Sequence, residues 1–161
     1  MKIILSTLVI CLCGSVGIVI KNKIKDKIGF YNFIKSYVVF CYQNISIFKN
    51  DLIKITDNFI ISKNTKNAKF CKIFAKTNQV YKINAEILKE IMCNDIEVGV
   101  IYSYLSSIGK SDYIEMNRSY DAILNFICDK TKEAEDKLKV NGELYFKISL
   151  AIGAVLAILI W

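Results

Sequence analysis

The sequence predicts an all-α protein, a membrane-anchored antiparallel bundle of about six helices with a transmembrane helix at each terminus. Three observations predict this class. Each end of the 161-residue chain carries an apolar run long enough to cross a bilayer, apolar side chains between the runs recur at spacings of three and four, and there are no prolines and only seven glycines. A three–four repeat is typical of helices with one buried face, and proline is the residue that most strongly breaks helices.

The apolar run at the carboxyl end extends from Leu144 to Trp161. It reaches roughly 27 Å at about 1.5 Å per residue, which covers most of a bilayer core of about 30 Å. Its only charge is Lys147, which lies close enough to the start for its ammonium group to reach the headgroups, and Trp161 suits the far interface. We therefore predict a C-terminal transmembrane helix over residues 144–161.

The apolar run at the amino end, Ile3–Ile20, contains no charge and is followed by four lysines: Lys21, Lys23, Lys25 and Lys27. Because the cytoplasmic flanks of membrane helices are enriched in basic residues, these lysines place the following domain in the cytoplasm. The predicted organisation is an N-terminal transmembrane helix over residues 1–21 and a soluble helical domain over residues 22–143. Membrane lipid is thus an expected partner.

An alternative interpretation of the first run is a cleaved signal peptide, because the run is short and contains the small residues Gly14, Ser15 and Gly17. The lysine cluster directly behind the run opposes export. The sequence does not decide whether Gly17 and Gly153, which lie within the two apolar runs, mark contacts between membrane helices.

Cysteine usage and the absence of histidine argue against metal, redox and common catalytic chemistry. The chain has no histidine and no Cys-x-x-Cys, and it has no Gly-x-Ser-x-Gly or phosphate-binding glycine loop. We therefore expect no enzyme activity, no metal and no cofactor. The four cysteines outside the apolar runs are expected to be buried free thiols of a reducing cytoplasm: Cys41, Cys71, Cys93 and Cys128.

The net charge of +7 is carried almost entirely by lysine and is uneven along the chain. Residues 1–85 hold 14 lysines and 3 acidic residues, whereas residues 86–161 hold 8 basic and 12 acidic residues. The basic half is either a surface that faces anionic headgroups or an ordinary solvated face. Aromatic residues among the lysines, Phe70, Phe74 and Tyr81, share one face of a predicted helix and are expected in the core, so nucleic acid is not an expected partner.

Between the apolar runs, the first helix is predicted to continue from the membrane to about residue 43, where Asn44–Ser46 interrupts it. A second helix covers Phe48–Ser62 and ends in a polar loop, Lys63–Lys66. The spacing of apolar residues then predicts a third, shorter helix over Phe70–Tyr81.

The remaining helices are predicted from their caps. Asn84 is expected to cap a fourth helix that ends at Asn94, and Asp95 a fifth that extends to Ile108. Gly109 then supplies a left-handed stop. Ser111 or Asp112 caps the last helix, whose expected inward-facing set is Met116, Tyr120, Ile123, Ile127, Ala134, Leu138, Gly142 and Tyr145.

Two local patterns resemble a known family. The first is Leu-x-x-Leu-Gly-x-x-Asp, present here as Leu105, Ile108, Gly109 and Asp112. The second is Gly-x-Leu-Tyr before the final apolar run, present as Gly142, Leu144 and Tyr145. With one membrane segment at each terminus, the whole chain resembles the stage III sporulation protein AB family of endospore-forming Firmicutes. It departs from the family pattern after the first helix, where Ile45-Ser46-Ile47 replaces Thr-Pro-Leu, and at Met116, where the family has glutamine.

The resemblance implies an all-helical domain distantly similar to the F-type inner-membrane platform protein of type II secretion and type IV pilus systems. It further implies a non-enzymatic component of the channel apparatus between mother cell and forespore, located in the mother-cell membrane around the forespore. The implied partners are the secretion-type ATPase and other membrane proteins of that apparatus. The alternative function is a membrane-surface scaffold, or a secretion or pilus platform component, unrelated to sporulation.

Overall fold

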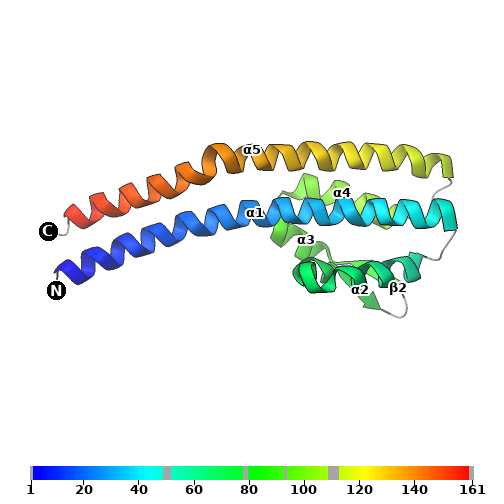
Figure 1. Cartoon of the computed structure of the whole chain (residues 1–161), viewed down its shortest axis with the longest axis horizontal. Coiled ribbons are helices and arrows are strands. Elements are labelled where there is room, and N and C mark those ends of the chain that lie inside the picture. Colours follow the sequence, from blue (N-terminus) through cyan, green and yellow to red (C-terminus); the bar gives the residue numbers. More distant parts are fainter. Residues whose placement is uncertain (1, 49–51, 78–79, 93, 109–112, 160–161) are drawn as a thin grey trace. The chain divides into compact units, whose positions relative to one another are not determined.

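The computed structural model describes residues 2–48, 52–77, 80–92, 94–108 and 113–159, and these ranges are almost entirely helical. The predicted all-α class is confirmed (Figure 1). Within these ranges the elements follow one another in this order: α1 (Lys2–Phe48), α2 (Leu52–Cys71), β1 (Phe74–Thr77), β2 (Val80–Ile83), α3 (Ala85–Met92), α4 (Asp95–Ser107) and α5 (Tyr113–Leu159).

The chain divides into two compact units. The first, here called the terminal pair, consists of Met1–Ile28 and Thr131–Trp161, and the second, here called the bundle, consists of Gly29–Lys130. The helices α1 and α5 contribute to both units. The boundaries expected at residues 21 and 144 stay predictions.

The bundle is organised around aromatic side chains of α1. The ring of Phe33 lies 5.4 Å from that of Phe59 on α2 and 5.7 Å from that of Phe70, and Tyr37 lies 4.5 Å from Phe74 on β1. Such tilted pairs each add about 0.5–1.5 kcal/mol beyond the burial of their area. The aromatic residues therefore fix α2 and the hairpin on one side of α1.

Helix α1 extends to Phe48, so the interruption predicted at Asn44–Ser46 is wrong. Asn44 donates a side-chain hydrogen bond to the carbonyl oxygen of Phe40 at 2.8 Å, and this contact lets a polar residue stay inside the helix. Helix α2 likewise continues through the predicted polar loop Lys63–Lys66 to Cys71. The segment has no proline or glycine, and lysine is a good helix former.

The helix predicted over Phe70–Tyr81 is also wrong: its first two residues end α2, and Phe74–Thr77 pairs with Val80–Ile83 as antiparallel strands. Phe74 pairs with Ile83 and Thr77 with Val80. The strands are rich in β-branched and aromatic residues, and the Tyr81 hydroxyl donates a hydrogen bond to Asp57 of α2. The hydrogen bond between Tyr81 and Asp57 of α2 thus favours a strand over the predicted helix at this position.

The predicted caps of the middle helices are largely confirmed. The side-chain oxygen of Asn84 accepts hydrogen bonds from the backbone N–H groups of Glu86 and Ile87, as expected. Helix α4 is capped one residue earlier than predicted, by Asn94, whose side chain accepts from the N–H of Ile96 at 3.0 Å. Asn94 is the cap in place of Asp95, because Asn94 has the extended backbone conformation of a cap residue. The predicted stop at Gly109 and the caps at Ser111 or Asp112 lie outside the described residues.

Helix α5 runs from Tyr113 to Leu159, and the polar stretch near Lys130 does not interrupt it. Of the side chains expected to face inward, Ile123, Ile127, Ala134 and Gly142 are buried, Tyr120 and Leu138 are half-buried, and that of Met116 lies outside the description. Tyr145 is wrong as an inward residue, since 40% of it is exposed. Its backbone, not its ring, faces α1: its carbonyl oxygen would lie 3.3 Å from a Cβ atom at Gly17.

Candidate functional site

Within the terminal pair, α1 and α5 make a close contact at Gly17. A Cβ atom added there would lie 2.9 Å from the Cα of Phe146 and 2.6 Å from the hydroxyl oxygen of Ser149. Real side chains essentially never approach backbone atoms this closely. Only glycine therefore lets the two helices meet at this point, as small residues do between membrane helices.

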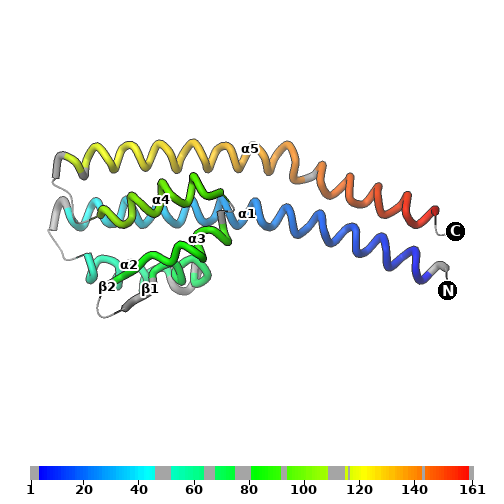
Figure 2. Tube along the Cα trace, turned by 180° about the vertical axis from the view of Figure 1, so that it is seen from behind, coloured from blue at the N-terminus to red at the C-terminus, as the bar shows by residue number. Residues whose placement is uncertain are grey.

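A second close contact lies further along the same pair, at Gly153. A Cβ atom there would lie 3.0 Å from the Cβ of Cys13 and 3.2 Å from the Cα of Ile10. Positions on α5 rise from 146 to 153 while those on α1 fall from 17 to 10, so the helices are antiparallel (Figure 2). Small side chains continue this contact at Ser6 and Ala157, which are both buried.

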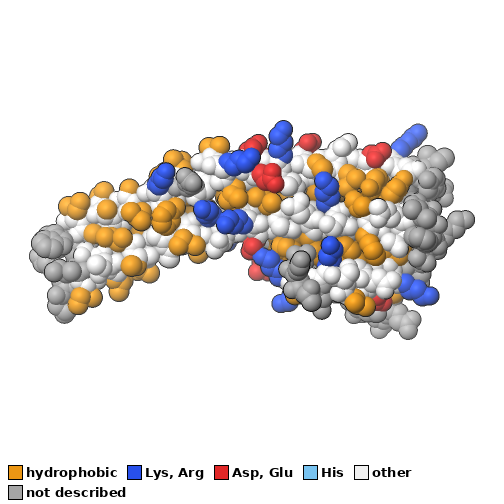
Figure 3. Space-filling model, viewed as in Figure 1, with side chains coloured by type: hydrophobic (Ala, Val, Ile, Leu, Met, Phe, Trp, Pro, Cys, Tyr) orange, Lys and Arg blue, Asp and Glu red, His pale blue; other side chains and the backbone are white. Residues whose placement is uncertain are grey.

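The outward surface of the terminal pair is apolar. Both α1 and α5 contain a segment long and apolar enough to cross a membrane. Large side chains on these segments are exposed, and orange side chains are spread along this part of the molecule in Figure 3. The most exposed include Ile4, Leu12, Val155, Ile158 and Leu159. Two helices joined by small residues and surrounded by exposed leucine and isoleucine form a candidate membrane hairpin.

The lysines expected to flank the membrane lie at the charged end of this hairpin. Lys23, Lys25 and Lys147 are exposed, whereas Lys21 and Lys27 are half-buried. The Cγ of Lys21 lies 4.0 Å from the position of a Cβ at Gly142, so the stem of this lysine packs against α5. The expected flanking residues of the two runs thus come together at one end of the terminal pair.

The described residues of the two family-type patterns belong to different units. Leu105 and Ile108 are buried in the core of the bundle. In the terminal pair, Gly142 is buried and Leu144 and Tyr145 are exposed, and Gly109 and Asp112 lie outside the described residues. The described members of both patterns therefore contribute to packing and to the apolar surface.

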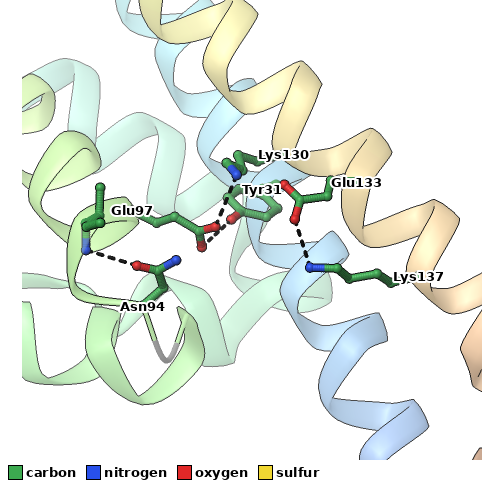
Figure 4. A network of polar contacts seen from close by, with 7 residues as sticks. Tyr31, Asn94, Glu97, Lys130, Glu133 and Lys137 are labelled. Atoms are coloured by element: carbon green, nitrogen blue, oxygen red, sulfur yellow. Dashed lines mark hydrogen bonds and ion pairs between the residues drawn. The ribbon is translucent and has the colours of Figure 1, made fainter.

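The bundle holds a buried carboxylate that sequence reasoning missed. Glu97 of α4 is only 5% exposed, and its Oε2 accepts a hydrogen bond of 2.8 Å from the Tyr31 hydroxyl of α1. The ammonium nitrogen of Lys130 on α5 lies 3.7 Å from Oε1. Figure 4 shows both side chains pointing at the carboxylate from different helices. The only sequence signal was a tyrosine and a lysine at core-facing positions.

Tyr37 makes a second buried polar contact inside the bundle. Its hydroxyl lies 2.9 Å from that of Thr56 on α2. Burial raises the pKa of Tyr37 well above its ordinary value, and burial also raises the pKa of the neighbouring Cys41 thiol to about 12. Cys41 is thus an unreactive thiol at neutral pH.

The expectation that the cysteines are buried holds for Cys41 and Cys71 but is wrong for Cys128, while Cys93 lies outside the described residues. Cys128 lies on the exposed side of α5, where the Lys35 ammonium donates a hydrogen bond to its sulfur at 3.3 Å. Across the described ranges, no group of three or more His, Cys, Asp or Glu side chains could hold a metal ion.

Two surfaces of the bundle have no covering element within the described chain. One is the outer face of α4, where Ile96 is 78% exposed and a Cβ at Gly99 would meet nothing within 4 Å. The other is a groove of about 340 Å³ between α1 and α2, here called the α1–α2 groove. Its lining consists of Lys35, Ser36, Val39, Phe40, Gln43, Phe59, Ser62 and Lys63.

Comparison with known proteins places this architecture in a family. No curated protein and no solved structure matches the chain. The family model described as stage III sporulation protein AB matches residues 2–161, which is essentially the whole chain. The chain belongs to the stage III sporulation protein AB family.

Proposed function

We propose that this protein is a docking platform in the channel apparatus between mother cell and forespore, held in the mother-cell membrane around the forespore. Its family supports a role in sporulation and is not known for enzymatic activity. The proposed partner on the cytoplasmic side is the secretion-type ATPase of the apparatus. The ring-forming membrane proteins of the same apparatus are the proposed partners within the bilayer.

The observation that carries the proposal is the antiparallel contact of α1 and α5 at Gly17 and Gly153. Two spans packed in this way leave both chain ends on one side of the membrane and residues 29–130 on the other. Because the lysines that follow the first span favour the cytoplasmic side, the bundle would face the cytoplasm. A domain held at two points has a defined orientation, which a platform requires.

The buried network around Glu97 supplies the mechanical part of the proposal. Tyr31 and Lys130 hold Glu97 from α1 and α5, the two helices that continue into the candidate spans. A force that a partner applies to α4 would therefore pass directly to α1 and α5. Separating the partners of a buried charge costs free energy. The three residues therefore resist moving apart when a force acts on them.

Binding to the purified ATPase tests the proposal. The full-length protein in lipid nanodiscs is mixed with the ATPase, and complex formation is measured by size-exclusion chromatography with light scattering. Empty nanodiscs are the control. A complex is expected; a folded, full-length chain that never binds the ATPase would contradict the docking function.

Thiol labelling tests the orientation. Cys128 is exposed on the bundle, whereas Cys41 and Cys71 are buried. In a Cys93→Ser background, a membrane-impermeant maleimide should modify Cys128 only after the cells are permeabilised, and Cys128→Ser should remove that signal. Labelling in intact cells would place the bundle outside. Salt-sensitive binding to anionic vesicles without any protein partner would instead favour the membrane-surface scaffold.

A further inference from the structure

The α1–α2 groove combines an apolar floor with a positively charged rim. Phe59 is buried at its base, and Val39 and Phe40 are half-buried beside it. Lys35 and Lys63 lie on the two helices that form its walls, and none of the described residues that line it is acidic. In Figure 3, lysine and hydrophobic side chains lie next to one another over α1 and α2.

We propose that the α1–α2 groove binds an acidic segment of a partner protein that inserts one apolar side chain between two carboxylates. The inference rests on the proposed docking function and names the surface and the chemistry of the partner. A volume of about 340 Å³ accepts one large side chain with the backbone on either side of it. The lysines would pair with carboxylates at the rim, where complementary charge adds specificity and speeds association.

The polar residues of the groove favour a peptide over a lipid headgroup. Sites for anionic lipids gather about 4–8 basic residues, whereas this groove has two lysines. Ser36, Gln43 and Ser62 also line the groove. The hydroxyls of Ser36 and Ser62 donate to carbonyl oxygens of their own helices, so their oxygens can accept from a peptide N–H, and the Gln43 amide can both donate and accept. The apolar floor then anchors one side chain, as in other helix-lined recognition grooves.

Photo-crosslinking in cells identifies the occupant. A benzoylphenylalanine is placed at Gln43 on the exposed rim of the groove in the full-length protein, and at Lys54 on the exposed face of α2 as a control outside the groove. Cross-linked peptides from sporulating cells are sequenced. The expected product is a segment with at least two carboxylates around an aromatic residue or leucine, found at position 43 and not at position 54.

Peptide binding then tests the charge pairing. The identified segment is synthesised with a fluorophore, together with an otherwise identical peptide in which Asn and Gln replace Asp and Glu. Anisotropy is measured against the full-length protein in nanodiscs. We expect about tenfold weaker binding for the amide peptide and for Lys63→Glu, because each replaces or reverses an exposed ion pair. Lys54→Glu should bind like the parent protein.

A second variant guards against a folding artefact. Ser62→Trp fills the groove without changing its charge and should also abolish binding, while the melting temperature reports whether either variant unfolds the bundle. Cross-links to lipid alone, a captured segment without carboxylates, or equal binding by Lys63→Glu and Lys54→Glu would overturn the inference. If the ATPase still binds the intact chain in those cases, only the groove assignment fails; if it does not, the docking function fails as well.

Discussion

Replacing Gly17 with alanine tests the membrane hairpin most directly. The new Cβ would lie 2.9 Å from the Cα of Phe146, whereas ordinary contact begins at 3.4 Å, so α1 and α5 must separate by about 0.5 Å (3.4 − 2.9). The hydroxyl of Ser149 must also turn away. Overpacking of this kind costs about 1–3 kcal/mol. Gly14→Ala is the matched control, because a Cβ at Gly14 meets nothing within 4 Å.

A disulfide between positions 153 and 13, at the second close contact, reports whether α1 and α5 have separated. In Gly153→Cys the new Cβ lies 3.0 Å from that of Cys13, close to the roughly 3.5–4.5 Å of a disulfide, so mild oxidation should join the two helices. The product is detected by mass spectrometry of the linked peptides, with Cys11 replaced by serine to prevent a competing bond. Cys13→Ser must abolish the signal.

A cost of 1–3 kcal/mol shifts the equilibrium between packed and separated α1 and α5 about 5- to 150-fold, since 1.4 kcal/mol corresponds to a factor of ten. We therefore expect Gly17→Ala to slow cross-linking by at least fivefold and Gly14→Ala to leave it unchanged. Equal cross-linking rates in the two variants would refute the close contact of α1 and α5 at Gly17 and, with it, the basis for a two-point anchor.

Three further predictions concern the bundle, each measured by unfolding of the full-length protein in nanodiscs. Tyr31→Phe should lower the unfolding free energy by about 1–3 kcal/mol, because it removes one hydrogen-bond donor from the buried Glu97 carboxylate; an unchanged unfolding free energy would contradict a stabilising Tyr31–Glu97 bond. Gly99→Ala should raise stability by about 1 kcal/mol, because alanine is the better helix former and the added methyl meets nothing; destabilisation would contradict the open surface of α4. Stability should fall as pH rises from about 9 to 12, because burial raises the pKa of Cys41 from 9.0 to about 12 in the folded state, so the unfolded state loses its proton first. Three pH units correspond to at most about 4 kcal/mol, and Cys41→Ala should flatten that part of the profile relative to the parent protein.

The features that sequence reasoning predicted correctly depend on local information. The two apolar runs, the long three–four repeat of α5 and the cap at Asn84 are all decided by residues within a few positions of one another. The same reasoning located the helices α3 and α4 to within one or two residues. Local patterns were sufficient wherever no distant residue competed.

The features that sequence reasoning missed depend on contacts between distant residues. Phe70, Ile73 and Phe74 have helical spacing, yet the same three side chains enter the core from a helix end, a turn and a strand. The Tyr81–Asp57 hydrogen bond, which accompanies the strand, joins residues far apart in the chain. The α1–α2 groove escaped prediction for the same reason, because Lys35 and Lys63 line one groove only when α2 packs against α1.

The Glu97 network is costly for a contact that only holds helices together. Transfer of a carboxylate from water into a protein interior costs several kcal/mol, and well-packed apolar residues often stabilise as much or more. What the network adds is position, since a hydrogen bond of 2.8 Å fixes the register of α4 on α1 more tightly than apolar packing does. Tyr31 lies near the first residue of the bundle and Lys130 is its last, so both groups hold α4 where the chain enters and leaves this unit. The proposed platform would need a fixed register at that place, because a partner docked on α4 would act on α1 and α5 through this network. Apolar substitution of Glu97 together with Tyr31 and Lys130 should preserve stability while weakening that coupling.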